Sequence, residues 1–333
     1  MALAALRGSA GVLAAALPAQ AGGLAWREVG NRLEAFDLFR RAEAVAGLPA
    51  GAPLGERLAR ILARDPWSAL FVAEGLGYAE GLRLGGSAGT LPAGALIPLH
   101  TGLGLHLAEA VLAEIAVSSP AAAGKALEHF VGRCRALSRA GCEEALLEQL
   151  GLAARALDAR HLGALDRLCA AVDRSLCELF WHGVGRGLYF APMNLLPWGE
   201  PGARALDEAL EAPHALARAN AVAGLGWALA LVNFRHPSVL ESFLLGQAHR
   251  LGDLEDALAQ GIAMAALTWW QAAGREARPG ELLAHAPAPR AARLWERCVR
   301  AAWKAGLAQL GQELAAGRCG GMFRYRPRAA EVA

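Results

Sequence analysis

His182 and Arg186 are the two residues of this sequence whose types and spacing point most directly to chemistry. They stand four residues apart in segment 181–190, WHGVGRGLYF, so a helix would turn both side chains toward one point. An imidazole can give or take a proton near neutral pH, and a guanidinium favours an anionic ligand or a carboxylate such as that of Glu74. His182 is therefore the best catalytic candidate, although no motif in the sequence assigns a catalytic residue.

Other polar residues share this setting, because they too lie inside long apolar runs, and they include Gln149, Asn220 and Gln260. Burying such a group without a partner costs about 1 to 3 kcal/mol, so neighbouring helices should bring these groups together. In one interpretation they form a structural hydrogen-bond network, in which Arg186 simply pairs with Glu74. In the other they line a ligand-binding groove with aromatic walls, and its predicted residues are Glu74, Tyr78, His100, His182, Arg186, Tyr189, Trp227 and Asn233.

A glycine pattern recurs in the stretches that carry these residues. Six segments read glycine, an aliphatic residue, then glycine or alanine, and they span 74–79, 101–106, 150–154, 181–190, 223–228 and 260–265. A dinucleotide-binding loop needs a strand before its glycines and a helix after them, and no strand signal precedes any copy. The pattern instead favours helices with one flattened face, where a neighbouring backbone approaches closely and offsets roughly 1 kcal/mol per interior glycine.

The fold that holds these segments is predicted to be helical. No stretch shows the alternation expected of strands, whereas amphipathic helices alternate with Gly-patterned ones. The predicted helices span 54–64, 68–84, 95–117, 121–138, 142–157, 161–172, 174–190, 203–210, 214–232, 237–249, 254–271 and 291–316. We therefore predict an all-α fold, a curved stack of about six divergent helical units with the Gly-patterned helices on the inner layer.

This stack is expected to form one domain over residues 51–320. Residues 1–50 are predicted to be an N-terminal segment, partly disordered or helical, and residues 321–333 a basic and aromatic tail. Residues 1–25 resemble a short signal peptide in outline, but glycines interrupt the Ala-rich run after Arg7. We predict a cytoplasmic protein, with export through this segment as the alternative.

Other patterns add little chemistry. Residues 85–89, Gly-Gly-Ser-Ala-Gly, match the nucleophile elbow of hydrolases, but no strand leads into them, so we interpret the match as chance. No two histidines stand three or four residues apart as in a helical metal site, and we predict neither a metal nor a cofactor. The six cysteines are expected to be buried reduced thiols.

Composition argues against two classes of partner. A net charge of +2 over 333 residues, without a basic stripe, gives no footprint for nucleic acid. The uncharged run 84–108 is interrupted by Pro92, Pro98 and several glycines, so we predict no integral membrane segment. With 55% hydrophobic residues, the chain can bury a large core.

The order of the six Gly-patterned segments resembles that of a family of uncharacterised bacterial proteins encoded beside the polyketide synthases of enediyne natural products. The likeness covers roughly residues 65–275 and rests on segments 182–190, 223–226 and 260–265. Segment 150–154 departs from the family pattern, because it lacks the aromatic residue and the histidine expected there. The resemblance implies a cytoplasmic accessory protein of secondary metabolism and says nothing about catalytic residues.

Three functions are compatible with these observations. The first is an accessory protein of natural-product biosynthesis that binds a largely apolar intermediate, or a biosynthetic protein partner, along the inner face of the stack. The second is an enzyme that acts on such an intermediate, with His182 as acid or base and Arg186 or Glu74 tuning it. The third is a structural scaffold for protein interactions without a small ligand. The ligand and the oligomeric state are not determined by the sequence.

Overall fold

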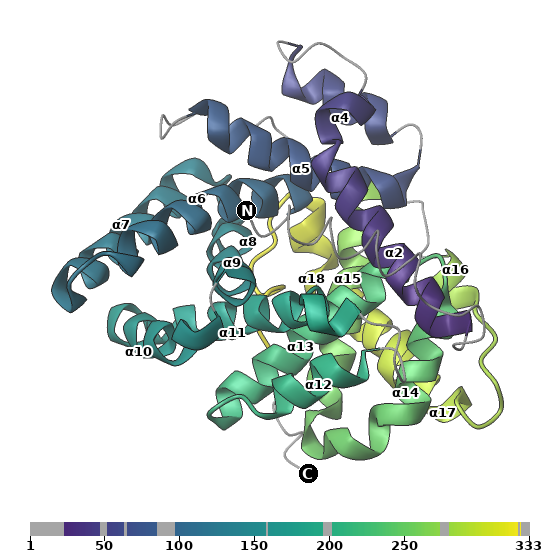
Figure 1. Ribbon diagram of the computed structural model, residues 1–333. Helices are drawn as coiled ribbons and strands as arrows, with labels where there is room; N and C mark the ends of the chain where they lie inside the picture. Colours follow the sequence, from purple (N-terminus) through teal and green to yellow (C-terminus); the bar gives the residue numbers. More distant parts are fainter. Residues whose placement is uncertain are drawn as a thin grey trace.

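The computed structural model describes residues 23–46, 52–62, 65–84, 97–157, 159–195, 202–273, 280–325 and 327. Most of these residues are helical and none is in a strand, which confirms the all-α class (Figure 1). The main helices are α2 (Gly23–Arg40), α3 (Ala42–Ala46), α4 (Leu54–Leu62), α5 (Pro66–Leu84), α6 (Ile97–Ala116), α7 (Pro120–Leu137), α8 (Glu143–Leu147), α9 (Gln149–Leu157), α10 (Leu162–Val172), α11 (Arg174–Tyr189), α12 (Ala203–Leu210), α13 (Ala215–Val232), α14 (Pro237–Leu251), α15 (Glu255–Ala273), α16 (Gly280–Ala284), α17 (Ala292–Trp295) and α18 (Ala302–Ala315).

Short helical turns complete the chain. Four of them are η1 (Ala159–His161), η2 (Pro192–Leu195), η3 (Gly252–Leu254) and the π-helical η4 (Glu296–Ala301). The predicted last helix, 291–316, is therefore α17, η4 and α18 in succession. Sequence periodicity cannot distinguish this arrangement from one α-helix, because a π turn adds only one residue to the local repeat.

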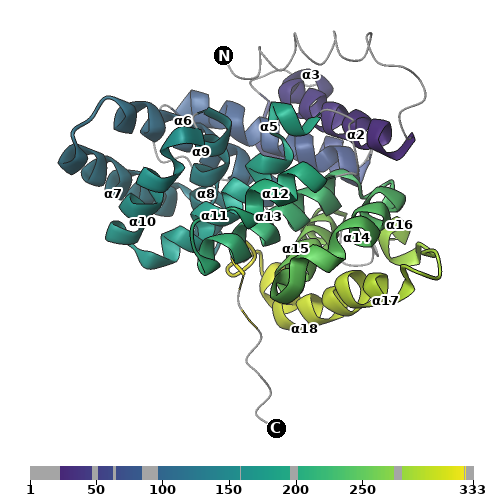
Figure 2. The ribbon, with the colours of Figure 1, turned by 60° about the horizontal axis from the view of Figure 1, so that its bottom comes forward.

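The Gly-patterned helices form the inner layer of the molecule. Along the chain, α5 contacts α6, α6 contacts α9, α9 contacts α11, α11 contacts α13 and α13 contacts α15. The last helix of this series, α15, also contacts α5 and α6, so the series closes on itself around an interior (Figures 1 and 2). The inner side of the helices therefore faces a common centre rather than an open concave surface.

The recurring glycines lie inside helices, as predicted, at the places where two helix backbones touch. A Cβ added to Gly151 of α9 would lie 1.8 Å from the carbonyl oxygen of Phe180 in α11. The next interfaces are equally tight, since a Cβ on Gly224 would lie 1.9 Å from the His182 carbonyl oxygen. Only glycine allows two backbones to come this close. The close contact fixes the positions of the side chains next to each glycine.

The predicted helix 142–157 is divided in two at Glu148. The amide of Glu148 donates to the carbonyl of Glu144, and the amide of Gly151 donates to the carbonyl of Glu148, which is a tighter turn. The Glu148 side chain is fully buried and bonded to residues of α11, so a tertiary contact accounts for this interruption.

Both ends of the described chain pack on the helical core. Helix α2, drawn in purple in Figure 1, contacts α5, α13 and α14, and its Arg32 is 1% exposed. Residues 317–325, here called the C-terminal strap, follow α18 and bury Met322 and Phe323 completely. Residues 1–22 of the predicted leader, and the loop with the 85–89 motif, lie outside the described residues.

Among the described helices, α13 is the one long and apolar enough to cross a membrane by length and composition. Of that stretch, 78% is buried inside the protein. Helix α13 lies between α11 and α15 and contacts both (Figure 2). That is the position of a core helix, and the same length and apolar composition are found in core helices.

Candidate functional site

A buried carboxylate organises the centre of the helical layer. One oxygen of Glu148 lies 2.9 Å from Nδ1 of His182, and the other accepts a hydrogen bond of 2.7 Å from Arg186. The amide of Gln149 donates to the same second oxygen at 2.5 Å. Glu148 has no exposed surface, while His182 and Arg186 are 1% and 2% exposed. We call Glu148, His182 and Arg186, with Glu74, the central ion cluster.

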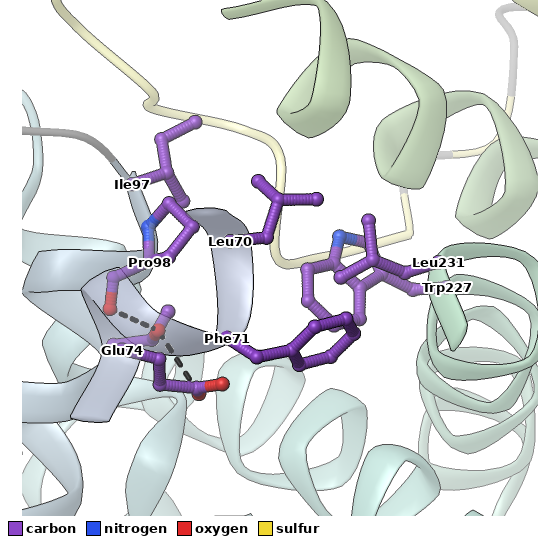
Figure 3. A pocket seen from close by; sticks show the side chains of 8 residues that line it. Leu70, Phe71, Glu74, Ile97, Pro98, Trp227 and Leu231 are labelled. Atoms are coloured by element: carbon purple, nitrogen blue, oxygen red, sulfur yellow. Dashed lines mark hydrogen bonds between the residues drawn. The ribbon is translucent and has the colours of Figure 1, made fainter. Parts of the chain in front are cut away.

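Glu74 joins this cluster from α5 on the opposite side of the arginine. Its carboxylate accepts a 3.3 Å hydrogen bond from Arg186 and a 3.0 Å hydrogen bond from the Thr101 hydroxyl of α6. Thr101 also bonds the carbonyl of Pro98 (Figure 3). One guanidinium therefore bridges two carboxylates that the chain places 74 residues apart, and it links α5, α11 and the α8–α9 junction.

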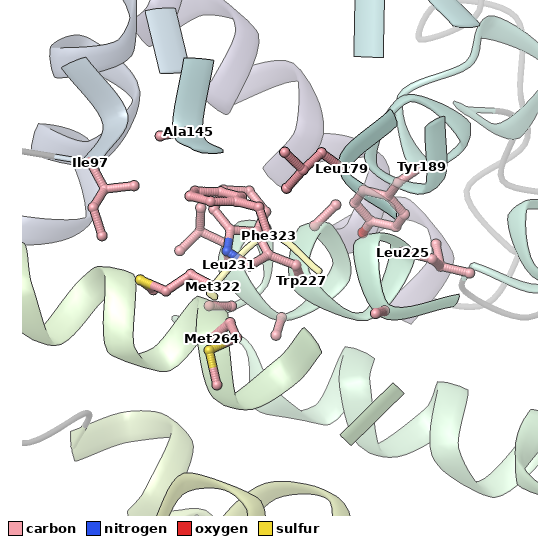
Figure 4. Close-up of a cluster of buried hydrophobic side chains, with 14 of the residues drawn as sticks. Ile97, Ala145, Leu179, Tyr189, Leu225, Trp227, Leu231, Met264, Met322 and Phe323 are labelled. Carbon is pink, nitrogen blue, oxygen red and sulfur yellow. The ribbon is translucent and has the colours of Figure 1, made fainter. Parts of the chain in front are cut away.

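Aromatic side chains cover the central ion cluster on one side. The Arg186 guanidinium lies over the Trp227 ring at 4.2 Å, a favourable cation–π distance. The ring of Phe323 meets His182 edge-on at 5.8 Å and lies 6.4 Å from Trp227. Figure 4 shows Phe323 surrounded by Trp227, Leu231 and the methionines 264 and 322. We call the space that the Phe323 ring fills the chamber. Its walls are apolar and aromatic, and the charged side chains of the central ion cluster, which line one side, are its floor.

The C-terminal strap that carries Phe323 is attached by polar contacts around its edge. The amide of Gly321 donates to Glu144 of α8 at 2.7 Å, and Arg324 pairs with Glu144 and Glu178. Farther along, the amide of Tyr325 donates to the Asn220 side chain of α13 at 2.7 Å. These contacts place the strap across the N-terminal ends of α8, α11 and α13. It therefore closes this end of the chamber.

Little free volume remains beside Glu74 and Trp227. A cavity of about 10 Å³ lies beside Glu74 and Trp227, which is room for about one water molecule (Figure 3). Its walls come from α5, α6 and α13 and consist of Leu70, Phe71, Glu74, Ile97, Pro98, Thr101, Trp227 and Leu231. The strap residues Met322 and Phe323 are buried here, at 1% and 0% exposure.

Buried polar atoms at this centre include three that have no hydrogen-bond partner within the described part of the chain. They are Nε1 of Trp227, Nε of Arg186 and Oε1 of Gln149. Buried polar groups in proteins usually have partners. The floor retains donors and an acceptor for a further polar group.

The eight predicted site residues divide among separate places. Glu74, His182, Arg186 and Trp227 come together at the centre. His100 lies apart from them and its Nε2 accepts from the backbone amide of Arg139 at 3.3 Å. Whether any of these residues binds a ligand stays a prediction.

The two tyrosines predicted as walls lie away from His182. Tyr78 is half-buried and donates to Glu109 at 2.7 Å, and burial together with that carboxylate raises its pKa to about 12. Tyr189 points to the other end of α11, where its hydroxyl accepts from Asn233 at 2.6 Å. The wall beside His182 is supplied by Phe323, because the strap folds inward.

A second polar cluster surrounds Tyr189 under α2. The Arg32 guanidinium lies 3.8 Å over the Tyr189 ring, forms an ion pair with Glu28 and donates to the Asn194 carbonyl. Burial raises the pKa of Tyr189 well above its usual range. Asn233 accepts from Asn31 as well, at 2.8 Å, so this predicted residue joins α2 to α13. The cluster thus joins α2 to α11 and α13, although Nε of Arg32 and Oδ1 of Asn194 have no hydrogen-bond partner within the described residues.

Sequence reasoning missed Glu148, Thr101 and Phe323. Glu148 follows two other glutamates in an amphipathic helix, where a carboxylate is expected to face solvent. Its neighbour Gln149, inside an apolar run, was the available signal. Phe323 belongs to a segment that sequence sets apart as a tail, and no local pattern indicates that it turns back into the core.

The Glu148–His182 contact also defines what the imidazole can do. A carboxylate at Nδ1 favours the proton on that nitrogen, which leaves Nε2 as the nitrogen that can accept a proton. Arg186 next to it can stabilise a negative charge. The arrangement can therefore take part in hydrogen bonding and in proton transfer at Nε2 of His182. Among the described residues, no group of three or more His, Cys, Asp or Glu side chains could hold a metal ion.

Glu74 gives the cluster a pH dependence that can be measured. Burial raises the pKa of the Glu74 carboxyl above 4.5, and the opposing effects of Arg186 and Thr101 only partly offset it. Above pH 4.5 the folded protein then holds this proton more tightly than the unfolded chain, so the group's contribution to stability falls as pH rises. We expect Glu74→Gln to gain stability relative to the wild type between about pH 4 and about pH 7, in urea denaturation followed by circular dichroism.

The matched control has the opposite sign. The hydrogen bond from Arg318 lowers the pKa of the exposed Glu313, so this carboxylate stabilises the fold only above its ordinary pKa. Glu313→Gln should therefore lose stability relative to the wild type over the same pH interval. Parallel pH profiles for the two variants would contradict the assignment for Glu74.

Comparisons of the chain with protein-family models, with curated proteins and with solved structures find no match. The site is accordingly defined by the geometry given above.

Proposed function

We propose that the protein binds an apolar small molecule with an anionic or hydrogen-bonding group in the chamber that Phe323 fills. The observation that carries the proposal is a charged floor of Glu148, His182 and Arg186 beneath aromatic walls. Binding sites for small molecules typically combine mostly apolar walls with a few placed polar groups. Unpaired polar atoms of Arg186 and Trp227 supply donors for the ligand's polar group.

The C-terminal strap is the part of the chamber wall that can yield. Residues 317–325 form turns rather than a helix, and their attachments are polar contacts at the chamber's edge. The other walls are helices whose backbones touch at glycines, which leaves them no room to move apart without losing packing. A ligand would therefore enter by displacing Met322 and Phe323, and its apolar part would replace their contacts.

The biological setting that we propose follows from the family resemblance. The molecule would be an intermediate of natural-product biosynthesis, presented free or by a biosynthetic protein, and this chain would be a cytoplasmic accessory protein. An aromatic group on the intermediate would match the space of the Phe323 ring, and a carboxylate would match Arg186. The proposal thus specifies an aromatic or polyene-like apolar body with an acidic or carbonyl end.

The test uses 2-naphthoate, which joins an aromatic body to a carboxylate. Isothermal titration should show binding to the wild type and at least about tenfold tighter binding to Phe323→Ala, because that variant no longer has to displace the ring. Arg318→Ala, a change at an exposed position of the same strap, should bind as the wild type does. Equal affinity of the wild type and Phe323→Ala, or no binding to either, would refute the chamber as the binding site.

An enzyme is the second candidate function, and the carboxylate at Nδ1 of His182 favours it over a scaffold. A general base at this position would remove an acidic C–H proton next to the carbonyl of a bound ketone. With 2-acetylnaphthalene in deuterated water, Phe323→Ala should accelerate deuterium exchange at the methyl group, as measured by NMR. Phe323→Ala/His182→Gln should lose the acceleration while keeping its helicity. Equal exchange rates would exclude His182 as a base.

A further inference from the structure

Two of the six cysteines meet where the C-terminal strap crosses the start of α8. Cys142 is the residue before α8, and Cys319 lies in the strap, and they are 2% and 1% exposed. The amide of Cys319 donates to the carbonyl of Gly141 at 2.8 Å, and the Cys142 thiol donates to the carbonyl of Gly317 at 3.2 Å. Backbone and side-chain bonds thus join the two segments on both sides of the cysteines.

The two thiols also influence each other's pKa. The Cys319 thiol hydrogen bonds to Cys142, and this bond is the largest effect on either group. It lowers the pKa of Cys142, with help from Arg139, and it raises the pKa of Cys319. A disulfide requires the two Cβ atoms to lie close together, on segments that need no rearrangement. Backbone and thiol hydrogen bonds already hold the two segments together, which favours such an approach.

The remaining four cysteines differ from this pair. Burial raises the pKa of Cys134, Cys169, Cys177 and Cys298, which keeps them as inert thiols. Cys177 contributes to the raised pKa of Cys169. The Cys177 thiol, however, donates its hydrogen bond to the Asp166 carbonyl. These two cysteines provide an internal comparison for any nonspecific oxidation.

We infer that Cys142 and Cys319 form a reversible disulfide that fastens the C-terminal strap over the central ion cluster. The oxidant is a low-molecular-weight disulfide. When the strap lifts, the Cys142 thiolate attacks one sulfur of the oxidant and releases one small thiolate. When the strap returns, the deprotonated Cys319 sulfur attacks the Cys142 sulfur of the mixed disulfide and releases the second small thiolate. In total, two protein thiols lose two protons and two electrons, and one small disulfide becomes two thiols.

The disulfide would link the strap covalently to the start of α8, so the strap could no longer be displaced freely. Phe323 lies four residues after Cys319, so a bridge at Cys319 restrains the ring that fills the chamber. A thiol-reducing environment would permit ligand entry, and an oxidising one would prevent it. This consequence rests on the proposed function, whereas the disulfide itself does not.

The bridge is tested by oxidising the full-length protein with glutathione disulfide, blocking free thiols with iodoacetamide and digesting with trypsin. The expected product joins peptide 140–155 to peptide 319–324, and dithiothreitol should release both peptides. Cys298→Ser should give the same product, and Cys142→Ser should not. Alkylation of Cys142 and Cys319 in the oxidised wild type, or glutathione retained on Cys142 alone, would overturn the inference. The wild-type digest decides the matter even if a variant fails to fold.

A second measurement separates the disulfide from its consequence. Oxidised wild type should bind 2-naphthoate at least about tenfold more weakly than reduced protein, and dithiothreitol should restore the affinity. Cys298→Ser should respond like the wild type. If the cross-linked peptide forms but affinity is unchanged, the strap does not guard the binding site, and the proposed function fails in that respect. If the reduced protein binds and no cross-linked peptide forms, the disulfide alone is refuted.

Discussion

Gly151→Ala should lower the free energy of unfolding by about 3 kcal/mol, at the upper end of the cost of overpacking a core. The added Cβ would lie 1.8 Å from the Phe180 carbonyl oxygen and 2.7 Å from the Val184 amide nitrogen, and both are backbone atoms of α11. A backbone cannot rotate away as a side chain can, so α9 and α11 must separate. Their separation would also pull Glu148 away from His182. Urea denaturation followed by circular dichroism measures the loss.

Gly132→Ala is the matched control for this prediction. Gly132 lies on the exposed side of α7, and a Cβ there would meet nothing within 4 Å. Because alanine favours a helix interior by roughly 1 kcal/mol over glycine, this variant should be more stable than the wild type. If both variants shift the unfolding midpoint in the same direction, the patterned glycines are not needed for close contact between helices.

Arg186→Met should destabilise the fold by about 3 to 5 kcal/mol, the usual cost of removing one partner from a buried ion pair. The methionine keeps most of the volume, but it leaves the fully buried Glu148 carboxylate without its guanidinium. It also removes the cation that lies over Trp227. The change in the free energy of unfolding is measured from the shift of the urea midpoint, with the slope m unchanged.

A double variant distinguishes lost charge pairing from lost packing. Adding Glu148→Gln to Arg186→Met removes the unpaired charge, so the double variant should be more stable than Arg186→Met alone, and the cycle yields the coupling between the two residues. Arg41→Met, in an exposed pair with Asp37, should cost less than about 1 kcal/mol. A cost for Arg186→Met as small as that of Arg41→Met would show that the central ion cluster does not hold the helices together.

The candidate site could be predicted in part, because some of its members carry a local signal. A histidine, an arginine and a glutamate inside apolar helices are conspicuous, and their side chains are only 1%, 3% and 16% exposed, which agrees with that setting. The structure pairs Arg186 with Glu74, as one interpretation held, and adds Glu148 as the principal partner of both α11 residues. The neighbouring Gln149 was the one local signal for Glu148, because the burial of Glu148 itself depends on helix α11.

By itself, the sequence determined the helical class, the course of most helices and the faces on which their backbones touch. Those properties depend on periodicity and on small residues within single segments, which act over one or two turns. Tertiary structure decided the break at Glu148, the return of α15 to α5 and the position of Phe323 against His182. Each depends on contacts between residues far apart in the chain, and hydrophobic burial favours many such pairings almost equally. The fit of helix backbones at the glycines, together with the few charge pairs that must be satisfied in the interior, selects one of them.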